Sequence, residues 1–204
     1  MERPAILKGE KVYLARFRRE DVDVIAPHMC NLELTTLLRG HGLTFSHEYE
    51  VAWFESISMN KPDEVVFAVL TLEHRLVGGV DLRDLNHPKQ TATLGAVIYN
   101  PGDWNQGYGS EAVKLLCQYG FCHFNLFNIL LNVFSFNPRA IRAFQKIGFR
   151  EMGRRRGVVP VGLERFDLVY MDLTRDELDL ETATMFTHSG GEYPGTHDGG
   201  LERD

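Results

Sequence analysis

The chain has 204 residues, of which 44% are hydrophobic and 25% are charged, a composition typical of a single folded domain. Its formal net charge of −6 argues against general binding to nucleic acid, and no apolar run approaches the roughly 20 residues that a membrane span needs. The first residues also lack the apolar core of a signal peptide, so we expect a cytoplasmic protein with neither membrane nor nucleic-acid partners. Three cysteines and eight histidines are scattered without metal-ligand spacing, which predicts reduced, buried thiols and no metal.

The first half of the chain predicts helices followed by an antiparallel meander. Residues 12–17 alternate between apolar and polar side chains, which predicts a strand. Residues 19–29 begin with charged residues and predict a helix, whereas residues 32–44 fit neither pattern. Residues 46–59 predict a helix capped by Ser46. Three more strands joined by short connections, which indicate antiparallel pairing, are predicted at 65–72, 76–85 and 91–99.

The second half predicts a strand–helix–strand unit and then a closing pair of strands. The predicted elements are a helix at 107–124, a strand at 129–134, a helix at 138–147, and strands at 149–156 and 166–173. A meander followed by such a unit predicts a mixed α/β arrangement, α+β in class. After residue 175 the chain is rich in glycine and loses its apolar periodicity. We therefore predict one domain over 1–175 and a flexible tail over 176–204.

The charges are unevenly distributed along the chain. Residues 112–150 contain five basic residues and no acidic one, so the rest of the chain carries a net charge of −11. A basic segment in an acidic protein fits an anionic ligand, although a solvated basic helix face has the same composition.

A Gly-x-Gly turn immediately precedes the helix predicted at 107–124. Gly107 and Gly109 let the backbone approach a ligand closely, and the unpaired N–H groups of the helix start favour a pyrophosphate. Glu111 lies in the first turn and would repel a phosphate, so we expect its side chain to point away. Residues 107–112 also satisfy the dinucleotide fingerprint Gly-x-Gly-x-x-Gly/Ala, but no acidic residue follows before Glu151 to bind a ribose. A P-loop is excluded because no Gly-Lys-Ser/Thr follows the turn.

A second motif opens and closes the helix predicted at 138–147. Asn137-Pro138 predicts an N-cap followed by proline at the first helical position, and Gly148 predicts the end of the helix. An apolar stripe on this helix includes Ala140 and Phe144.

Together these motifs resemble the GCN5-related N-acetyltransferase (GNAT) superfamily. The similarity lies in Trp-Asn-Gln-Gly-Tyr-Gly-Ser-Glu-Ala at 104–112 and in Asn-x-x-Ala-x-x-x-Phe-x-x-x-Gly-Phe at 137–149. Within the superfamily the chain resembles the ribosomal-protein N-terminal (Rim-type) branch, with spermidine acetyltransferases close by, and the resemblance covers roughly residues 8–175. It implies a mostly antiparallel twisted sheet of about six to seven strands, splayed at its centre and flanked by about four helices.

The resemblance also implies transfer of an acetyl group from acetyl-CoA to an amine. The pantetheine arm would bind backbone near Val97, Ile98 and Tyr99, and it would contact Asn137 and Phe144. The pyrophosphate would lie on Gln106, Gly107, Tyr108, Gly109 and Ser110.

Phe144 departs from the family pattern, because many relatives have a tyrosine there that serves as general acid. A thiol with a pKa near about 8.5 is already a fair leaving group, so this contribution is dispensable. The candidates to replace the missing acid are Tyr108, Tyr99, Ser135 and water. Asp81 and Asp84 are candidates for holding a cationic amine or relaying its proton, or else they are solvated strand residues.

The amine decides how much base catalysis is needed. At neutral pH about one α-amino group in six is unprotonated, against fewer than about one lysine in a thousand. We therefore predict the α-amine of a peptide or protein N-terminus as the acceptor. Two alternatives stay open: a small amine such as a polyamine, aminoglycoside or amino acid, and a noncatalytic sensor of acyl-CoA. A homodimer formed through the tail is also compatible with the sequence.

Overall fold

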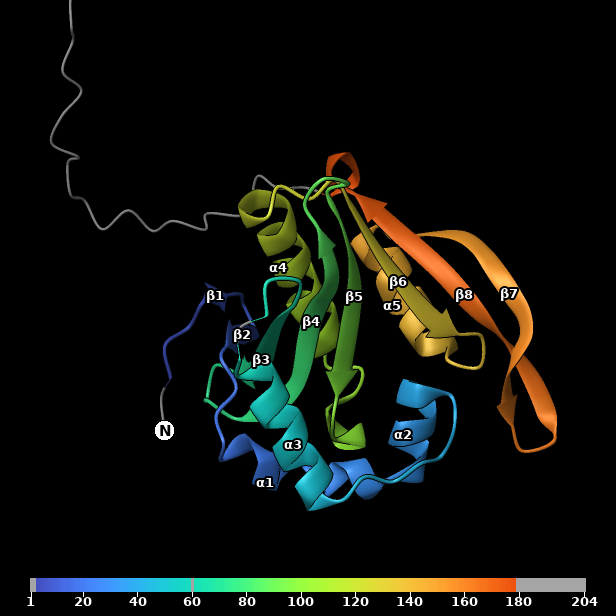
Figure 1. Cartoon of the computed structure of the whole chain (residues 1–204), viewed down its shortest axis with the longest axis horizontal. Coiled ribbons are helices and arrows are strands. Elements are labelled where there is room, and N and C mark those ends of the chain that lie inside the picture. Colours follow the sequence, from blue (N-terminus) through green and yellow to red (C-terminus); the bar gives the residue numbers. More distant parts are fainter. Residues whose placement is uncertain (1–2, 60, 179–204) are drawn as a thin grey trace, which may run out of the picture.

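The computed structural model describes residues 3–59 and 61–178 and is built on one sheet of eight strands in the order β1-β2-β3-β4-β5-β6-β8-β7 (Figure 1). The strands are β1 (Leu7–Lys8), β2 (Val12–Ala15), β3 (Val65–Thr71), β4 (Leu76–Asn86), β5 (Thr91–Ile98), β6 (Asn128–Phe134), β7 (Arg150–Val161) and β8 (Glu164–Thr174). Neighbouring strands are antiparallel except β5 and β6, which are parallel. The mostly antiparallel sheet confirms the predicted fold class. The strand missing from the sequence prediction is β1, whose two residues are too few to show an alternating pattern.

Five α-helices flank the sheet within the described residues: α1 (Asp21–Ile25), α2 (Leu32–Arg39), α3 (His47–Ile57), α4 (Tyr108–His123) and α5 (Pro138–Ile147). The helix predicted at 19–29 is shorter, because Pro27 lacks the N–H that would continue α1, and a 3₁₀ turn follows at His28–Cys30. The ambiguous segment 32–44 contains α2, which begins where the Asn31 side chain accepts hydrogen bonds from the N–H groups of Glu33 and Leu34.

Two hydrophobic cores cover the two faces of the sheet. Alternate residues of β2 and β3 divide between them: Leu14 and Phe67 belong to the core under α4, whereas Tyr13 and Ala68 belong to the core under α1, α2 and α3. Figure 1 accordingly shows α4 running along the sheet and α1 to α3 gathered at one end of it.

The sheet splits between β5 and β6. These strands pair only from Thr91 opposite Asn128 to Thr93 opposite Leu130, and beyond Thr93 strand β5 continues to Ile98 with β4 as its partner. Figure 1 shows β5 and β6 diverging towards the end where α2 lies. The splay that the family resemblance implied is therefore present, and beyond Thr93 it leaves one backbone edge of β5 without a strand partner among the described residues.

The folded part of the chain includes residues past the predicted domain boundary at residue 175. A 3₁₀ turn spans Arg175–Glu177, and Leu178 packs into the main core with 7% of its surface exposed. The rest of the predicted tail, 179–204, lies outside the described residues.

Cys117 is buried, but Cys30 and Cys122 are exposed, which corrects the expectation that all three thiols are buried. Within the described residues, no helix combines the length and apolar character that crossing a bilayer requires.

Candidate active site

A groove of about 470 Å³ lies between β5 and α5, beside the point where β5 diverges from β6. Four segments line it: the end of β5, the loop and first turn that begin α4, the inner face of α5 and, at one end, α2. The lining residues include Ala96, Val97, Ile98, Trp104, Gly107, Gly109, Ser110, Asn137, Arg139, Phe144, Leu34 and Leu37. The two sequence motifs, about thirty residues apart, therefore form opposite walls of one site.

The Gly-x-Gly turn provides a row of backbone donors on the first wall. Gly107 has φ +87°, a left-handed conformation that costs little only for glycine, and it is the N-cap of α4. The helical hydrogen bonds begin with Glu111 N–H donating to Gly107 O at 3.0 Å, so the N–H groups of residues 107–110 have no acceptor within the helix. Donors at the positive end of a helix are suited to a phosphate, and binding of a pyrophosphate at this turn stays a prediction.

Glu111 points away from the groove, as expected. Its carboxylate accepts hydrogen bonds from the backbone N–H groups of Glu10, Lys11 and Val12 at 2.5, 2.9 and 3.0 Å. This contact brings Lys11 to the turn, where its Nζ donates to Gln106 O at 3.1 Å. Sequence reasoning missed Lys11, because a residue about one hundred positions from the motif carries no local signal of its place.

The open edge of β5 contributes backbone groups that face α5. Tyr99 N–H donates to Val77 O on β4 at 3.0 Å, so the preceding residue, Ile98, and likewise Ala96 direct their N–H and C=O groups to the other edge. Ile98 O there accepts a hydrogen bond from Trp104 Nε1 at 2.9 Å. Of the three residues predicted at this position, Val97 and Ile98 line the groove and Tyr99 does not.

Tyr99 instead lies in the core under α1 to α3 with 5% of its surface exposed. Burial raises the pKa of its hydroxyl, and the negative charges of Glu50, Asp21 and Asp81 raise it further. The phenol therefore stays protonated and offers no titratable group near neutral pH.

Helix α5 forms the second wall. The Asn137 side chain caps the helix by accepting from Ala140 N–H at 3.1 Å, which leaves its amide nitrogen as a donor. Phe144 lines the groove and meets Phe149 edge to face, with 5.8 Å between ring centroids. Arg139, Arg142 and Lys146 line the same wall and come from the basic segment noted in the sequence.

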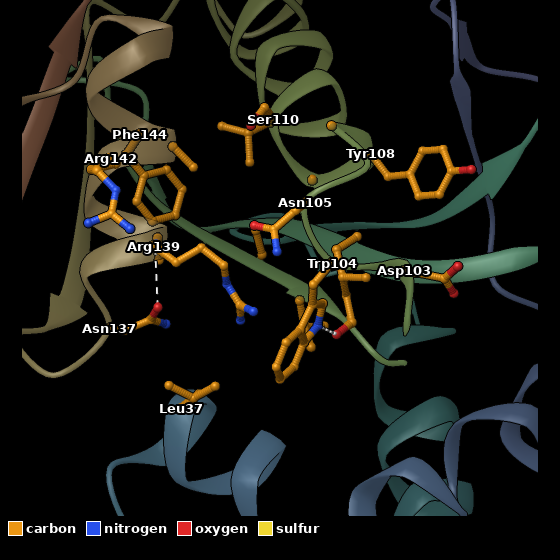
Figure 2. A pocket seen from close by; sticks show the side chains of 18 of the residues that line it. Leu37, Asp103, Trp104, Asn105, Tyr108, Ser110, Asn137, Arg139, Arg142 and Phe144 are labelled. Carbon is orange, nitrogen blue, oxygen red and sulfur yellow. Dashed lines mark hydrogen bonds between the residues drawn. The ribbon is translucent and has the colours of Figure 1, made fainter. Parts of the chain in front are cut away.

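The two walls meet at a cation–π contact. The Arg139 guanidinium carbon lies 3.7 Å from the centre of the Trp104 ring, and Figure 2 shows this guanidinium between Phe144 and Leu37. Burial lowers the pKa of Arg139, opposed by the charge of Glu33 on α2.

Asp81, a candidate for taking the amine proton, lies on β4 and is not among the residues that line the groove. It pairs with Gly95 on β5, two residues past the last β5–β6 pair, and a Cβ at Gly95 would clash with its carboxylate. The carboxylate therefore lies across β5, with Oδ1 2.6 Å from Arg83 Nε. Burial raises the pKa of Asp81, whereas the charge of Arg83 lowers it. Asp84, the other acidic candidate, is exposed.

Tyr108 and Ser135 are not brought together with Asp81. Figure 2 shows the Tyr108 ring directed away from Phe144 and Asn137. Ser135 joins β6 to β8: its N–H donates to Asp167 O at 2.9 Å, and its hydroxyl accepts from Asp167 N–H at 3.0 Å. Tyr108 nevertheless lines the groove, whereas Ser135 is not among its lining residues. No group of three or more potential metal ligands occurs in the described part of the chain.

A family model described as an acetyltransferase (GNAT) domain matches residues 11–150. The chain belongs to the GNAT acetyltransferase family. This GNAT chain is 31% identical over 165 residues to the mouse alpha/beta-tubulin-N-acetyltransferase 9, covering 72% of the chain and 65% of that protein. It is 32% identical over 85 residues to the spermidine N(1)-acetyltransferase of Escherichia coli K12, covering 42% of the chain and 45% of that protein. The alignments thus span about half to two thirds of the length of these curated relatives.

Solved structures agree on the fold of this GNAT domain. Spermidine N-acetyltransferase from Vibrio cholerae, solved in complex with CoA and spermine, superposes with a TM-score of 0.73 at 20% identity, covering 81% of the chain and 96% of that structure. These comparisons support the superfamily, and the Rim-type branch stays a prediction.

Proposed function

We propose that this chain transfers the acetyl group of acetyl-CoA to a primary amine, and that the acceptor is the α-amine of a peptide or protein N-terminus. The observation that carries the proposal is the groove itself, in which a helix start and an unpaired strand edge face a basic helix. Acetyl-CoA carries one anionic end, one extended polar arm and one reactive thioester, and the groove offers a complement to each.

The anionic end is assigned to the Gly-x-Gly turn. The N–H groups of residues 107–110 bind the pyrophosphate, and Lys11, Arg142 and Lys146 supply cations around it. The arm lies along β5 as an added strand, hydrogen-bonded to Ala96 and to the N–H of Ile98. The Asn137 amide donates to the arm from the other wall, and Phe144 packs against it.

Acetyl-CoA supplies an acetyl group activated as a thioester. The neutral amine attacks the carbonyl carbon, so that the new C–N bond forms as the C–S bond breaks. Backbone N–H groups of β5 bind the carbonyl oxygen as it gains negative charge. Asp81, directly or through water, takes the proton that the amine loses. Phe144 cannot donate a proton to the departing sulfur, so the thiolate leaves without an acid at this position or takes its proton from water.

The charges of the groove support an α-amine over a polyamine. Three cations line the groove, and the carboxylate among the lining residues, Asp103, is already bound in two hydrogen bonds to Arg75 at 2.7 and 2.8 Å. A polyamine would bring several ammonium groups close to these three cations, which would repel them, whereas the N-terminus of a peptide brings one ammonium group. Leu34, Leu37 and Leu38 of α2 give the acceptor end an apolar wall that suits a peptide side chain. The polyamine alternative is favoured by the named spermidine acetyltransferases among the relatives.

A thiol-release assay with acetyl-CoA tests the proposal. The panel contains peptides with free and with blocked N-termini, spermidine, an aminoglycoside and free amino acids. We expect turnover with the free peptides and none with their blocked counterparts. Turnover with spermidine alone would show that the acceptor is a polyamine and not a peptide. Binding of CoA without turnover on any amine would favour a noncatalytic sensor of acyl-CoA.

A further inference from the structure

Arg139 lies at the junction between the cofactor end and the acceptor end of the groove. Its guanidinium stacks on Trp104 at 3.7 Å, and the indole is itself fixed by its hydrogen bond to Ile98 O at 2.9 Å. Figure 2 shows the Gly-x-Gly side of the groove, with Ser110, on one side of Arg139 and Leu37 of α2 on the other. The charge is therefore held at a defined place close to the acceptor end.

The position of Arg139 is electrostatically unfavourable without a ligand. It lies in the first turn of α5, where the helix dipole disfavours a cation, and it is partly withdrawn from solvent. No carboxylate in the described ranges, 3–59 and 61–178, lies within ion-pair distance of it. Glu33 on α2 acts on it only through its charge.

The stacking also leaves the binding capacity of Arg139 intact. A guanidinium that packs its face on an aromatic ring keeps its N–H donors in the plane of the group, directed outward. Such a group binds a carboxylate through two parallel hydrogen bonds.

On the basis of the proposed function, we infer that Arg139 selects acceptors that carry a carboxylate near the reacting amine, as does a peptide with Asp or Glu at its second residue. The partly desolvated guanidinium pairs with this carboxylate while the amine faces the splay of β5. The Arg139 guanidinium could instead bind a phosphate of CoA. Arg142 serves as the comparison that distinguishes a phosphate from an acceptor carboxylate, because it lies one turn further along the same face of α5 and towards the cofactor end.

The experiment compares wild type, Arg139→Gln and Arg142→Gln on two peptides that differ only in Asp or Asn at the second residue. For wild type we expect kcat/KM to favour the Asp peptide by about tenfold or more, the size of a lost charged hydrogen bond. Arg139→Gln should abolish this preference and leave the Kd of CoA, measured by calorimetry, unchanged. Arg142→Gln should weaken CoA binding and keep the preference.

Two outcomes would overturn this inference and leave the proposed function intact. Wild type could acetylate both peptides equally, or Arg139→Gln could weaken CoA binding while the peptide preference persists, which would assign Arg139 to a phosphate. A wild-type enzyme that acetylates no peptide would refute the proposed acceptor class, and with it this inference. Retained CoA binding by Arg139→Gln also shows that the variant is folded.

Discussion

Glu111 and Val12 are 99 residues apart in the sequence, and the carboxylate of Glu111 accepts a hydrogen bond from the N–H of Val12 at 3.0 Å. Two further N–H groups of the same turn bind this carboxylate, so the residue next to the phosphate turn anchors β1 and β2 to α4. Glu111 is therefore compatible with a proposed anion site, because its carboxylate binds the backbone of residues 10–12 and does not face the groove.

Replacing Glu111 by Gln should destabilise the fold by about 2 kcal/mol, because hydrogen bonds to a charged acceptor are lost and a neutral amide satisfies the three donors poorly. Urea denaturation of the variant measures this change. Glu10→Gln removes the same charge from an exposed neighbouring side chain and should have little effect. Equal stability of the two variants would mean that the contact contributes nothing.

Acetyl-CoA should raise the melting temperature, since it binds the folded state alone. At one hundred times Kd the shift should be about 5–10 °C for a domain of this size. Gly109→Glu should remove the shift, because a Cβ at this position already lies 3.3 Å from Ile98 Cγ1 and the added carboxylate faces the phosphates. Gly153→Glu is the matched control, as a Cβ there meets nothing within 4 Å. A full shift in Gly109→Glu would place the phosphates elsewhere.

Asp81→Asn should lower kcat/KM by about one hundredfold if the carboxylate takes the amine proton. Burial raises the pKa of Asp81, so wild-type activity should fall as pH drops through that raised pKa and the base becomes protonated. The asparagine variant should lack the part of this acidic limb that comes from Asp81 and keep the part set by protonation of the amine itself. Asp84→Asn, on the same strand but exposed, should behave as wild type. An acidic limb unchanged in Asp81→Asn would assign the proton to another group.

Glu50→Gln should stabilise the protein at neutral pH. Glu50 is 4% exposed, its Oε1 has no hydrogen-bond partner in the described structure, and burial raises its pKa. A carboxyl whose pKa is higher in the folded state binds its proton more tightly there, so its contribution to stability is present below the ordinary value of 4.5 and is lost as pH rises through the folded pKa. Glutamine mimics the protonated form at every pH.

Chemical denaturation at several pH values measures this effect. The two proteins should be equally stable in acid and should diverge as pH rises. Glu55→Gln, at an exposed position of the same helix, should show no such divergence. A glutamine variant less stable than wild type at pH 7 would show that the buried carboxylate is stabilised by a partner.

Local signals predicted α5 and the turn before α4 well. Helix α5 has the bounds expected from its Asn-Pro start and its Gly end, because capping depends on residues within one turn of each other. Helix α2 was left ambiguous although Asn31 caps it, because its short apolar stripe merges with the following loop. Strand β1 has too few residues for a pattern and exists through its pairing with β2.

The sequence by itself determined the family, the class of fold, the Gly-x-Gly turn before α4 and the helix α5 that faces it, since each follows from residues that are neighbours along the chain. Only the tertiary structure decided which side chains enter the groove. It brought Lys11 to the turn, placed the Asp81 carboxylate over Gly95 and packed Arg139 on Trp104. It also buried Tyr99 in the core under α1 to α3 and directed the Tyr108 ring away from Phe144. These relations depend on strand register and on how far β5 and β6 diverge, and such long-range geometry results from the packing of the whole sheet.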